Sequence, residues 1–207
     1  MALFTSMAGA LILDFDGVGL FEAMDAQRVA RGLSWREVAD EIWALSAVLN
    51  TQRQSHPISP STLVNVGKRG ATSCQHALFM LRWLGRSPES FLKGAPQGLL
   101  EGAPRGPGGP GLTAAGLQAG ALPAAGLPAA GPDRRLRWDL KGLYAALDAR
   151  RHEREMTWPE LARELRCTPS QLTGLRTARF ATGMNIAMHI VQWLDRPAAD
   201  FVYLARW

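Results

Sequence analysis

Four polar side chains in the second half of the chain share one surface of a predicted short helix. These side chains are Ser170, Gln171, Thr173 and Arg176. Leu172 and Leu175, three positions apart, form the opposite face of that helix and are expected to be buried. Glutamine can pair with adenine through two hydrogen bonds, serine and threonine can contact several bases, and arginine can reach guanine or phosphate. The expected chemistry is therefore recognition of base edges by hydrogen bonds.

Two helix-start signals position these side chains. Thr157 can cap a first helix while Glu160 reaches back to the cap, which is the capping-box pattern. Thr168 can cap a second helix, and Pro169 suits its first position because proline has no N–H to leave unpaired. Two short helices joined by a tight turn, the second with a polar outer face, are typical of a helix-turn-helix motif. Gly174 would let a ligand approach the second helix closely.

From about position 143 to 201 the chain resembles a Cro/CI-type domain, also called XRE or lambda-repressor-like. The resemblance rests on the segments 158–165 (Trp-Pro-Glu-Leu-Ala-Arg-Glu-Leu), 168–175 (Thr-Pro-Ser-Gln-Leu-Thr-Gly-Leu) and 193–197 (Trp-Leu-Asp-Arg-Pro). It implies a bundle of four or five helices whose third helix enters the major groove of double-stranded DNA. It also implies a role in regulating transcription.

Basic residues flank the motif and suit contacts with phosphates, which position a protein on DNA without reading the sequence. Arg166 and Arg179 lie on either side of the predicted third helix. Arg134, Arg135 and Arg137 precede the first helix of this half and resemble the basic arms that some such domains lay in a groove. A solvated linker end is the alternative interpretation of these three arginines.

An aspartate pair near the start of the chain resembles a phosphatase motif. Asp14 and Asp16 lie in the sequence Leu-Ile-Leu-Asp-Phe-Asp-Gly-Val, which is similar to the nucleophile motif of haloacid-dehalogenase-type phosphatases. The pattern around Asp16 recurs around Asp139, where the second aspartate is absent. A catalytic nucleophile does not explain this recurrence, whereas a helix N-cap does. We therefore expect both Asp16 and Asp139 to be caps, and we expect no enzymatic activity.

The recurrence extends over most of the two halves. Residues 15–42 align without a gap to residues 138–165, and 12 of the 28 positions are identical. Residues 59–63 then match 168–172, and residues 83–91 match 193–201, so the first copy holds 14 extra residues between its second and third helices. Duplication of one helical domain is the simplest explanation. The repeated tryptophans are expected to pack in the two cores.

The first copy lacks the tight turn between its second and third helices that the resemblance implies. Its second helix begins at a capping box formed by Ser34 and Glu37, and the apolar pattern predicts that this helix continues to near Asn50. A polar loop is expected over residues 51–56. The third helix of this copy would expose the candidate DNA contacts Ser61, Thr62, Asn65, Lys68 and Arg69. Two interpretations stay open for this copy: direct contact with DNA, or a role in packing, homodimerisation or binding of a protein partner.

These patterns predict an all-α chain of two small four- or five-helix bundles of lambda-repressor-like type. The first domain covers residues 14–93 and the second covers residues 134–207. Residues 94–133 contain 18 glycines and prolines in 40 positions and predict a flexible linker. Such a coil would span roughly 35 Å, close to the ~34–36 Å between successive major grooves on one face of DNA.

Composition narrows the class of protein. The net charge is +5, and residues 134–207 carry 13 Lys or Arg against eight Asp or Glu, so the positive surplus lies in the second copy. Cys74 and Cys167 lack the spacing of a disulfide framework or a zinc site, which favours reduced thiols in the cytoplasm. The four histidines lack ligand spacing, and no cofactor is expected. The apolar run 7–13 is too short to span a membrane.

The sequence therefore predicts a cytoplasmic, sequence-specific DNA-binding protein, a transcriptional regulator that reads the major groove with the third helix of its second domain. The alternative is a helical protein-interaction module that is derived from helix-turn-helix domains and does not bind DNA.

Overall fold

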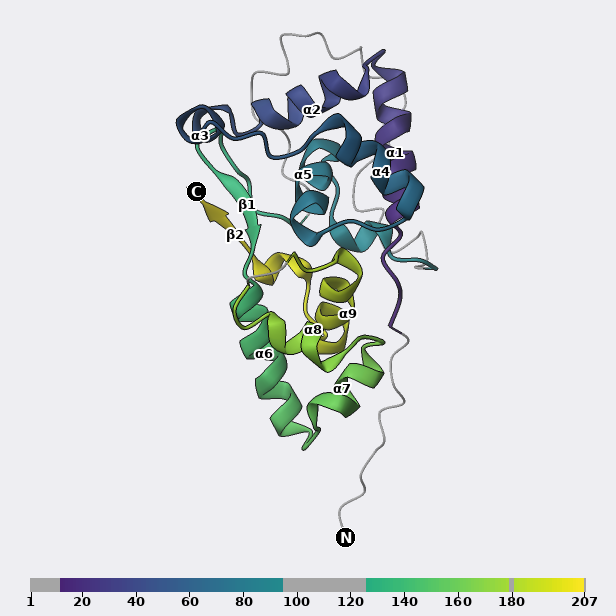
Figure 1. The fold of residues 1–207 in the computed structure, drawn as a ribbon, viewed down its shortest axis with the longest axis vertical. Helices are drawn as coiled ribbons and strands as arrows, with labels where there is room; N and C mark the ends of the chain where they lie inside the picture. Colours follow the sequence, from purple (N-terminus) through teal and green to yellow (C-terminus); the bar gives the residue numbers. More distant parts are fainter. Residues whose placement is uncertain (1–11, 95–125, 179–180, 207) are drawn as a thin grey trace.

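The computed structural model describes residues 12–94, 126–178 and 181–206. These residues are mostly helical, as predicted, with one short two-stranded sheet (Figure 1). The first copy contains α1 (Gly17–Ala30), α2 (Trp35–Ala44), α3 (Ala47–Arg53), α4 (Pro60–Arg69), α5 (Cys74–Leu84) and a 3-10 helix, η1 (Pro88–Phe91). The second copy contains β1 (Arg135–Trp138), α6 (Leu140–Glu153), α7 (Trp158–Glu164), α8 (Pro169–Gly174), α9 (Met184–Leu194), the 3-10 helix η4 (Ala198–Phe201) and β2 (Val202–Ala205).

The first helix of each copy begins at an aspartate cap, which confirms the structural interpretation of the recurring motif. Asp16 accepts a hydrogen bond from the backbone N–H of Gly19 at 3.0 Å, and Asp139 accepts one from Gly142 at 2.8 Å. A Cβ atom at Gly19 would lie 2.7 Å from the Asp16 carboxylate, and one at Gly142 would lie 2.3 Å from that of Asp139. A side chain at either glycine would therefore displace the capping carboxylate from its present position.

Equivalent residues of the two copies make equivalent contacts. The indole N–H of Trp83 donates to Glu41 at 2.8 Å, and the indole of Trp193 donates to Glu164 at 2.8 Å. The aromatic pairs Phe21–Trp35 and Tyr144–Trp158 are both stacked. Trp83 and Trp193 are 9% and 7% exposed, so the repeated tryptophans lie against the cores as predicted.

The extra residues of the first copy fold differently from our prediction of one long helix. Helix α2 ends at Ala44, and a separate helix, α3, starts at Ala47. Ser46 breaks the helix because its backbone is not helical and its buried hydroxyl donates to the carbonyl of Arg134 at 2.8 Å. The expected polar loop over residues 51–56 is also wrong at its start, since α3 continues to Arg53.

The last strand of the second copy pairs with the strand that precedes its first helix. β1 and β2 are antiparallel, with Arg135 opposite Ala205 and Trp138 opposite Val202. The first copy has a single bridge at the equivalent place, between Phe15 and Leu92. The sequence did not predict this sheet, because strands of four residues are too short to show a clear alternation.

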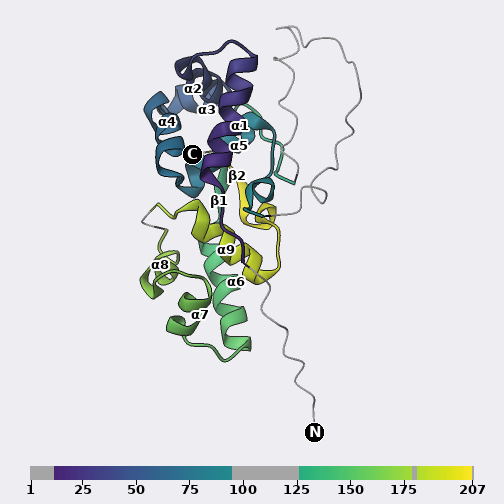
Figure 2. The ribbon, with the colours of Figure 1, turned by 90° about the vertical axis from the view of Figure 1, so that its right-hand side faces the viewer.

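The two copies pack directly on each other where α5 and α9 meet (Figures 1 and 2). The backbone N–H of Cys74 donates to the carbonyl of Thr182 at 2.8 Å, and Met184 N–H donates to Thr72 at 2.9 Å. We call the contact built around these residues the seam. The sequence predicts a flexible coil of about 35 Å between the copies. No pattern in the sequence indicates that the two copies contact each other.

The end of the predicted linker lies against the first copy. Leu127 is 5% exposed, and the carbonyl of Pro132 accepts a hydrogen bond from Leu49 N–H at 3.3 Å. Arg82 donates to the carbonyl oxygens of Ala130 at 2.6 Å and of Leu45 at 2.5 Å. This part of the linker is therefore ordered by contacts with α3 and α5, while residues 95–125 lie outside the described residues.

Candidate functional site

The two short helices of the second copy form as the cap signals predict. Thr157 and Glu160 form a capping box at the start of α7, and Thr168 and Gln171 form another at the start of α8. Arg166 turns the chain between them with a left-handed backbone, at φ of 52°. Leu172 and Leu175 are 0% and 1% exposed, so the apolar face of this segment is anchored in the core.

The polar residues of α8 and the turn that follows it are exposed, as the spacing of the leucines requires. All four predicted base-contacting side chains are in this exposed set: Ser170, Gln171, Thr173 and Arg176. The hydroxyl of Thr173 donates to the carbonyl of Pro169 at 3.1 Å, which keeps the side chain against its own helix. The arrangement presents hydroxyl, amide and guanidinium groups on one surface, and these groups are suited to hydrogen bonding with a large polar ligand.

Gln171 has a second role that the sequence reasoning did not include. Its Oε1 accepts hydrogen bonds from the backbone N–H of Thr168 at 2.9 Å and from the Thr168 hydroxyl at 3.1 Å. A bidentate pair with adenine uses this same oxygen as an acceptor. Such a pair therefore requires either a third hydrogen bond to Oε1 or an opened cap.

A surface hollow of about 310 Å³ separates α8 from the start of α9. Its lining consists of Ser170, Gln171, Gly174, Ala181, Thr182, Gly183 and Ile186. Thr182 belongs to the seam, so the exposed face of α8 and the contact between the copies border the same hollow. The α8 face therefore continues into the surface around the seam.

The basic residues around the motif differ in how far they are available to a ligand. Arg166 is exposed, but it also donates to the carbonyl of Ile12 and lies 3.6 Å from the Asp14 carboxylate. Arg134 is half-buried and pairs with Asp133 at 3.3 Å. Arg179 lies outside the described residues.

Arg135 and Arg137 do not extend from the protein as an arm. Both belong to β1, where Arg137 is half-buried and Arg135 is 6% exposed. Arg135 donates to Oδ1 of Asn50 and to the hydroxyl of Ser55, both in the first copy. Burial lowers the pKa of both guanidiniums. In this conformation Arg135 joins the copies and is not available for a phosphate contact.

The first copy presents a smaller polar surface on α4. Ser61, Asn65, Lys68 and Arg69 are exposed, whereas Thr62 is half-buried. The hydroxyl of Ser59 caps the helix by accepting from the N–H of Thr62 at 3.2 Å, as Thr168 does in α8. The structure therefore presents all five candidate residues of this copy on one helix, although Thr62 is less accessible than the others.

His189, for which the sequence indicated no ligand or catalytic role, lies where the second copy contacts the first. His189 is 2% exposed, and its Nε2 lies within hydrogen-bond distance of the Asp14 carboxylate, at 2.8 Å, while its Nδ1 lies 3.0 Å from the carbonyl oxygen of Leu165. The hydrogen bond from His189, together with the charge of Arg166, lowers the pKa of Asp14. Residue spacing contains no signal for this contact, since its partners are 175 positions apart.

Within the described residues, no group of three or more His, Cys, Asp or Glu side chains could hold a metal ion. No helix in the same part of the chain combines the length and apolar composition that crossing a bilayer requires.

Comparisons of the chain with protein-family models, with curated proteins and with solved structures found no match. The arrangement of its own residues is therefore what supports a function.

Proposed function

We propose that the protein binds double-stranded DNA sequence-specifically and regulates transcription, with α8 as the helix that enters the major groove. The observation that carries the proposal is the geometry of α7, the turn and α8. Leu172 and Leu175 anchor α8 and the turn after it in the core, and exposed hydroxyl, amide and guanidinium groups lie on the outer side of the helix and of this turn. In this proposal the two copies are lambda-repressor-like bundles, and the protein acts in the cytoplasm.

The proposed mechanism combines two kinds of contact. Arg166 and Arg176 neutralise phosphates, which releases counterions and makes the affinity depend on salt. Ser170 and Thr173 contact base edges, while Gln171 donates from its amide nitrogen with its oxygen still in the cap. The +5 charge of residues 134–207, obtained as 13 minus eight, favours this copy as the main DNA contact.

A fluorescence anisotropy titration against a labelled random-sequence duplex tests the proposal. We expect binding at micromolar protein or below, and affinity that falls as salt rises with a slope set by the number of phosphates contacted. Absence of binding, or binding that is indifferent to salt, would overturn the proposal.

The substitution Gln171→Glu tests the proposed role of α8 more specifically than this titration does. Glutamate preserves the capping box, as Glu160 does at α7, but it replaces the amide donor with a negative charge facing the DNA. We expect a loss of specific affinity of about 1–3 kcal/mol with unchanged thermal stability. Glu160→Gln is the matched control, because it makes the reverse exchange in the other capping box and should leave DNA binding unchanged.

A helical protein-interaction module is the second candidate function. The first copy favours it, since residues 1–93 carry nine basic and eight acidic residues and so little net charge. If the chain shows no DNA affinity, this candidate replaces the first.

A further inference from the structure

The seam between the copies is reciprocal. Cys74 and Met184 occupy equivalent positions, 110 residues apart, and so do Thr72 and Thr182. Cys74 N–H donates to Thr182, and Met184 N–H donates to Thr72. Such an exchange between equivalent residues is the signature of a two-fold interface, in which each partner uses the same patch. The two copies of one chain are therefore paired as the subunits of a symmetric dimer would be.

The segments that precede the first helix of each copy also contact the other copy, although at non-equivalent positions of its last α-helix. In the second copy, the carbonyl of Leu136 accepts from Gln75 of α5 at 2.9 Å. The equivalent residue of the first copy, Leu13, exchanges two hydrogen bonds of 2.9 Å with Gln192 of α9. Each segment thus lies on the last helix of the other copy. Together with the seam, these contacts fix the orientation of one copy relative to the other.

Helices α4 and α8, which correspond to the predicted third helices of the two copies, lie on the same side of this paired unit. Figure 2 shows α4 and α8 on one side of the molecule, one above the other. Helix α4 ends at Arg69, four residues before Ser73, and the hollow beside α8 is lined by Thr182 and Gly183. Ser73 and Gly183 form the antiparallel bridge of the seam. Helices α4 and α8 therefore flank the seam on one side of the molecule.

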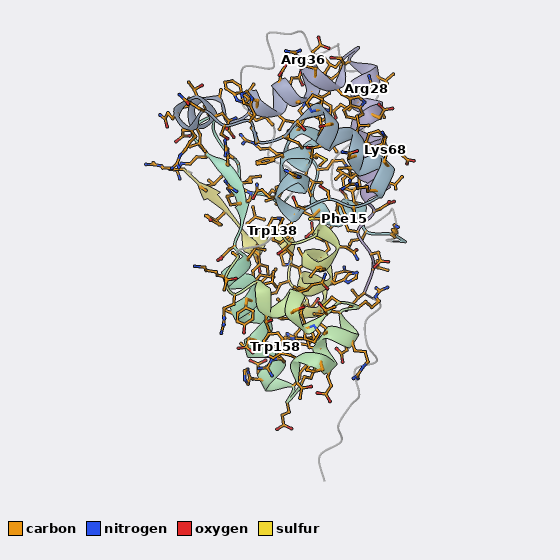
Figure 3. All side chains as sticks on the ribbon, viewed as in Figure 1. Phe15, Arg28, Arg36, Lys68, Trp138 and Trp158 are labelled. Carbon is orange, nitrogen blue, oxygen red and sulfur yellow. The ribbon has the colours of Figure 1, made fainter. Side chains whose placement is uncertain are left out.

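The outer residues of the two helices are not the same. Where α8 carries Gln171 and Gly174, the equivalent positions of α4 carry Thr62 and Asn65. Asn65 is exposed and can pair with adenine through two hydrogen bonds, at a position where α8 has no side chain. Lys68 and Arg69 follow on the same helix and are exposed, as phosphate contacts must be. The side chains of Asn65 and Lys68 thus give α4 a contact set of its own. Figure 3 labels Lys68 at this helix.

We propose that one chain binds one bipartite DNA site, with α4 and α8 in successive major grooves and with half-sites of unequal sequence. The inference rests on the proposed function, since it assigns α4 as the second reader of the same duplex. Successive major grooves on one face of B-DNA are ~34–36 Å apart, so the half-sites are expected about 10 base pairs apart, centre to centre. The reciprocal seam means that no second chain is required to complete the site.

Selection of bound sequences tests this inference with the full chain. A random duplex pool of about three helical turns, ~30 base pairs, is enriched on the protein, and the enriched duplex is then footprinted. We expect two blocks of selected bases, different from each other, on one face of the DNA. Analytical ultracentrifugation of the complex should give one chain per duplex. The Asn65→Ala variant should relax selection in one block only, whereas Gln171→Glu should relax it in the other.

The outcomes separate this inference from the proposed function. A single block that responds to Gln171→Glu and ignores Asn65→Ala would overturn the inference and retain DNA binding by α8. Two identical blocks with two chains per duplex would also overturn it, because the two half-sites would then be bound by two different chains. Failure to enrich any sequence would overturn both. Gln52→Ala, at an exposed polar position of α3, is the control and should leave both blocks unchanged.

Discussion

Arg135 donates to Oδ1 of Asn50, and this buried pair joins β1 of the second copy to the inserted helix α3 of the first. Arg135 is 6% exposed and Asn50 is 1% exposed, so neither group can exchange its partner for water without the copies separating. The Asn50 amide also donates to the carbonyl of Trp43 at 2.6 Å. The inserted helix α3 therefore forms part of a buried site, here called the socket, that holds Arg135 of the other copy.

The first prediction concerns this pair. Asn50→Ala should lower the free energy of unfolding by about 1–3 kcal/mol, because the buried Arg135 guanidinium loses the Asn50 acceptor and, among the described residues, keeps only the Ser55 hydroxyl as a side-chain partner. Urea denaturation of the full chain measures the change. Asn65→Ala, which truncates an exposed asparagine of α4, is the control and should stay within about 0.5 kcal/mol of the unchanged protein.

A second substitution distinguishes a pairing effect from simple loss of volume. Arg135→Met removes the charge while keeping apolar bulk, so adding it to Asn50→Leu should recover part of the stability lost in Asn50→Leu alone. A double variant whose loss equals the sum of the two single losses would show that the two side chains do not interact.

Three features could be predicted from the sequence, because each depends on residues within four positions of one another. They are the helix caps, the buried leucines of α8 and the exposure of the polar face of α8. The socket for Arg135 could not be predicted. Its partners are 85 positions apart, and three nearby arginines in a glycine-rich context look like a solvated arm. The break at Ser46 was missed for the same reason, since the carbonyl that accepts from its hydroxyl belongs to Arg134. Long-range hydrogen bonds override the local helical pattern at these places.

The second prediction concerns the two repeated tryptophans. Trp83→Phe and Trp193→Phe should each lower the free energy of unfolding by about 1–3 kcal/mol, because each removes an indole N–H that donates to a glutamate and leaves a small cavity beside a buried ring. The two losses should agree within about 1 kcal/mol if the copies use the contact equally. Urea denaturation checks both. A large loss at one site and none at the other would contradict the equivalence of the two contacts.

The third prediction concerns the thiols. Burial raises the pKa of Cys74 to about 12 and that of Cys167 to about 11. Since the thiolate is the reactive form, native protein at neutral pH should be alkylated at least ~100-fold more slowly than urea-unfolded protein. Peptide mapping by mass spectrometry should find Cys167 modified before Cys74, because Cys167 is half-buried and Cys74 is buried. Earlier modification of Cys74 would contradict the burial of the α5 start.

The last prediction concerns the contact between Asp14 and His189. The hydrogen bond from His189 lowers the pKa of Asp14 below its ordinary value of 3.8, and Arg166 at 3.6 Å acts in the same direction. A carboxyl whose pKa is lower in the folded state stabilises the protein fully above its unfolded pKa and loses that contribution as pH falls through the folded value. The chain should therefore lose stability from this pair as the pH falls below about 5, and the loss is complete once Asp14 is protonated in the folded state. The Asp14 side chain is 44% exposed, so the loss should not exceed about 1 kcal/mol.

Urea midpoints measured across this range test the assignment. The difference between the unchanged protein and Asp14→Asn should shrink as pH falls, since protonated Asp14 and asparagine are both uncharged. Asp40→Asn, at an exposed carboxylate of α2, is the control for general effects of charge. If the stability difference at Asp14 is the same at every pH, the carboxylate does not stabilise the seam through its charge, and the imidazole of His189 is held by the Leu165 carbonyl alone.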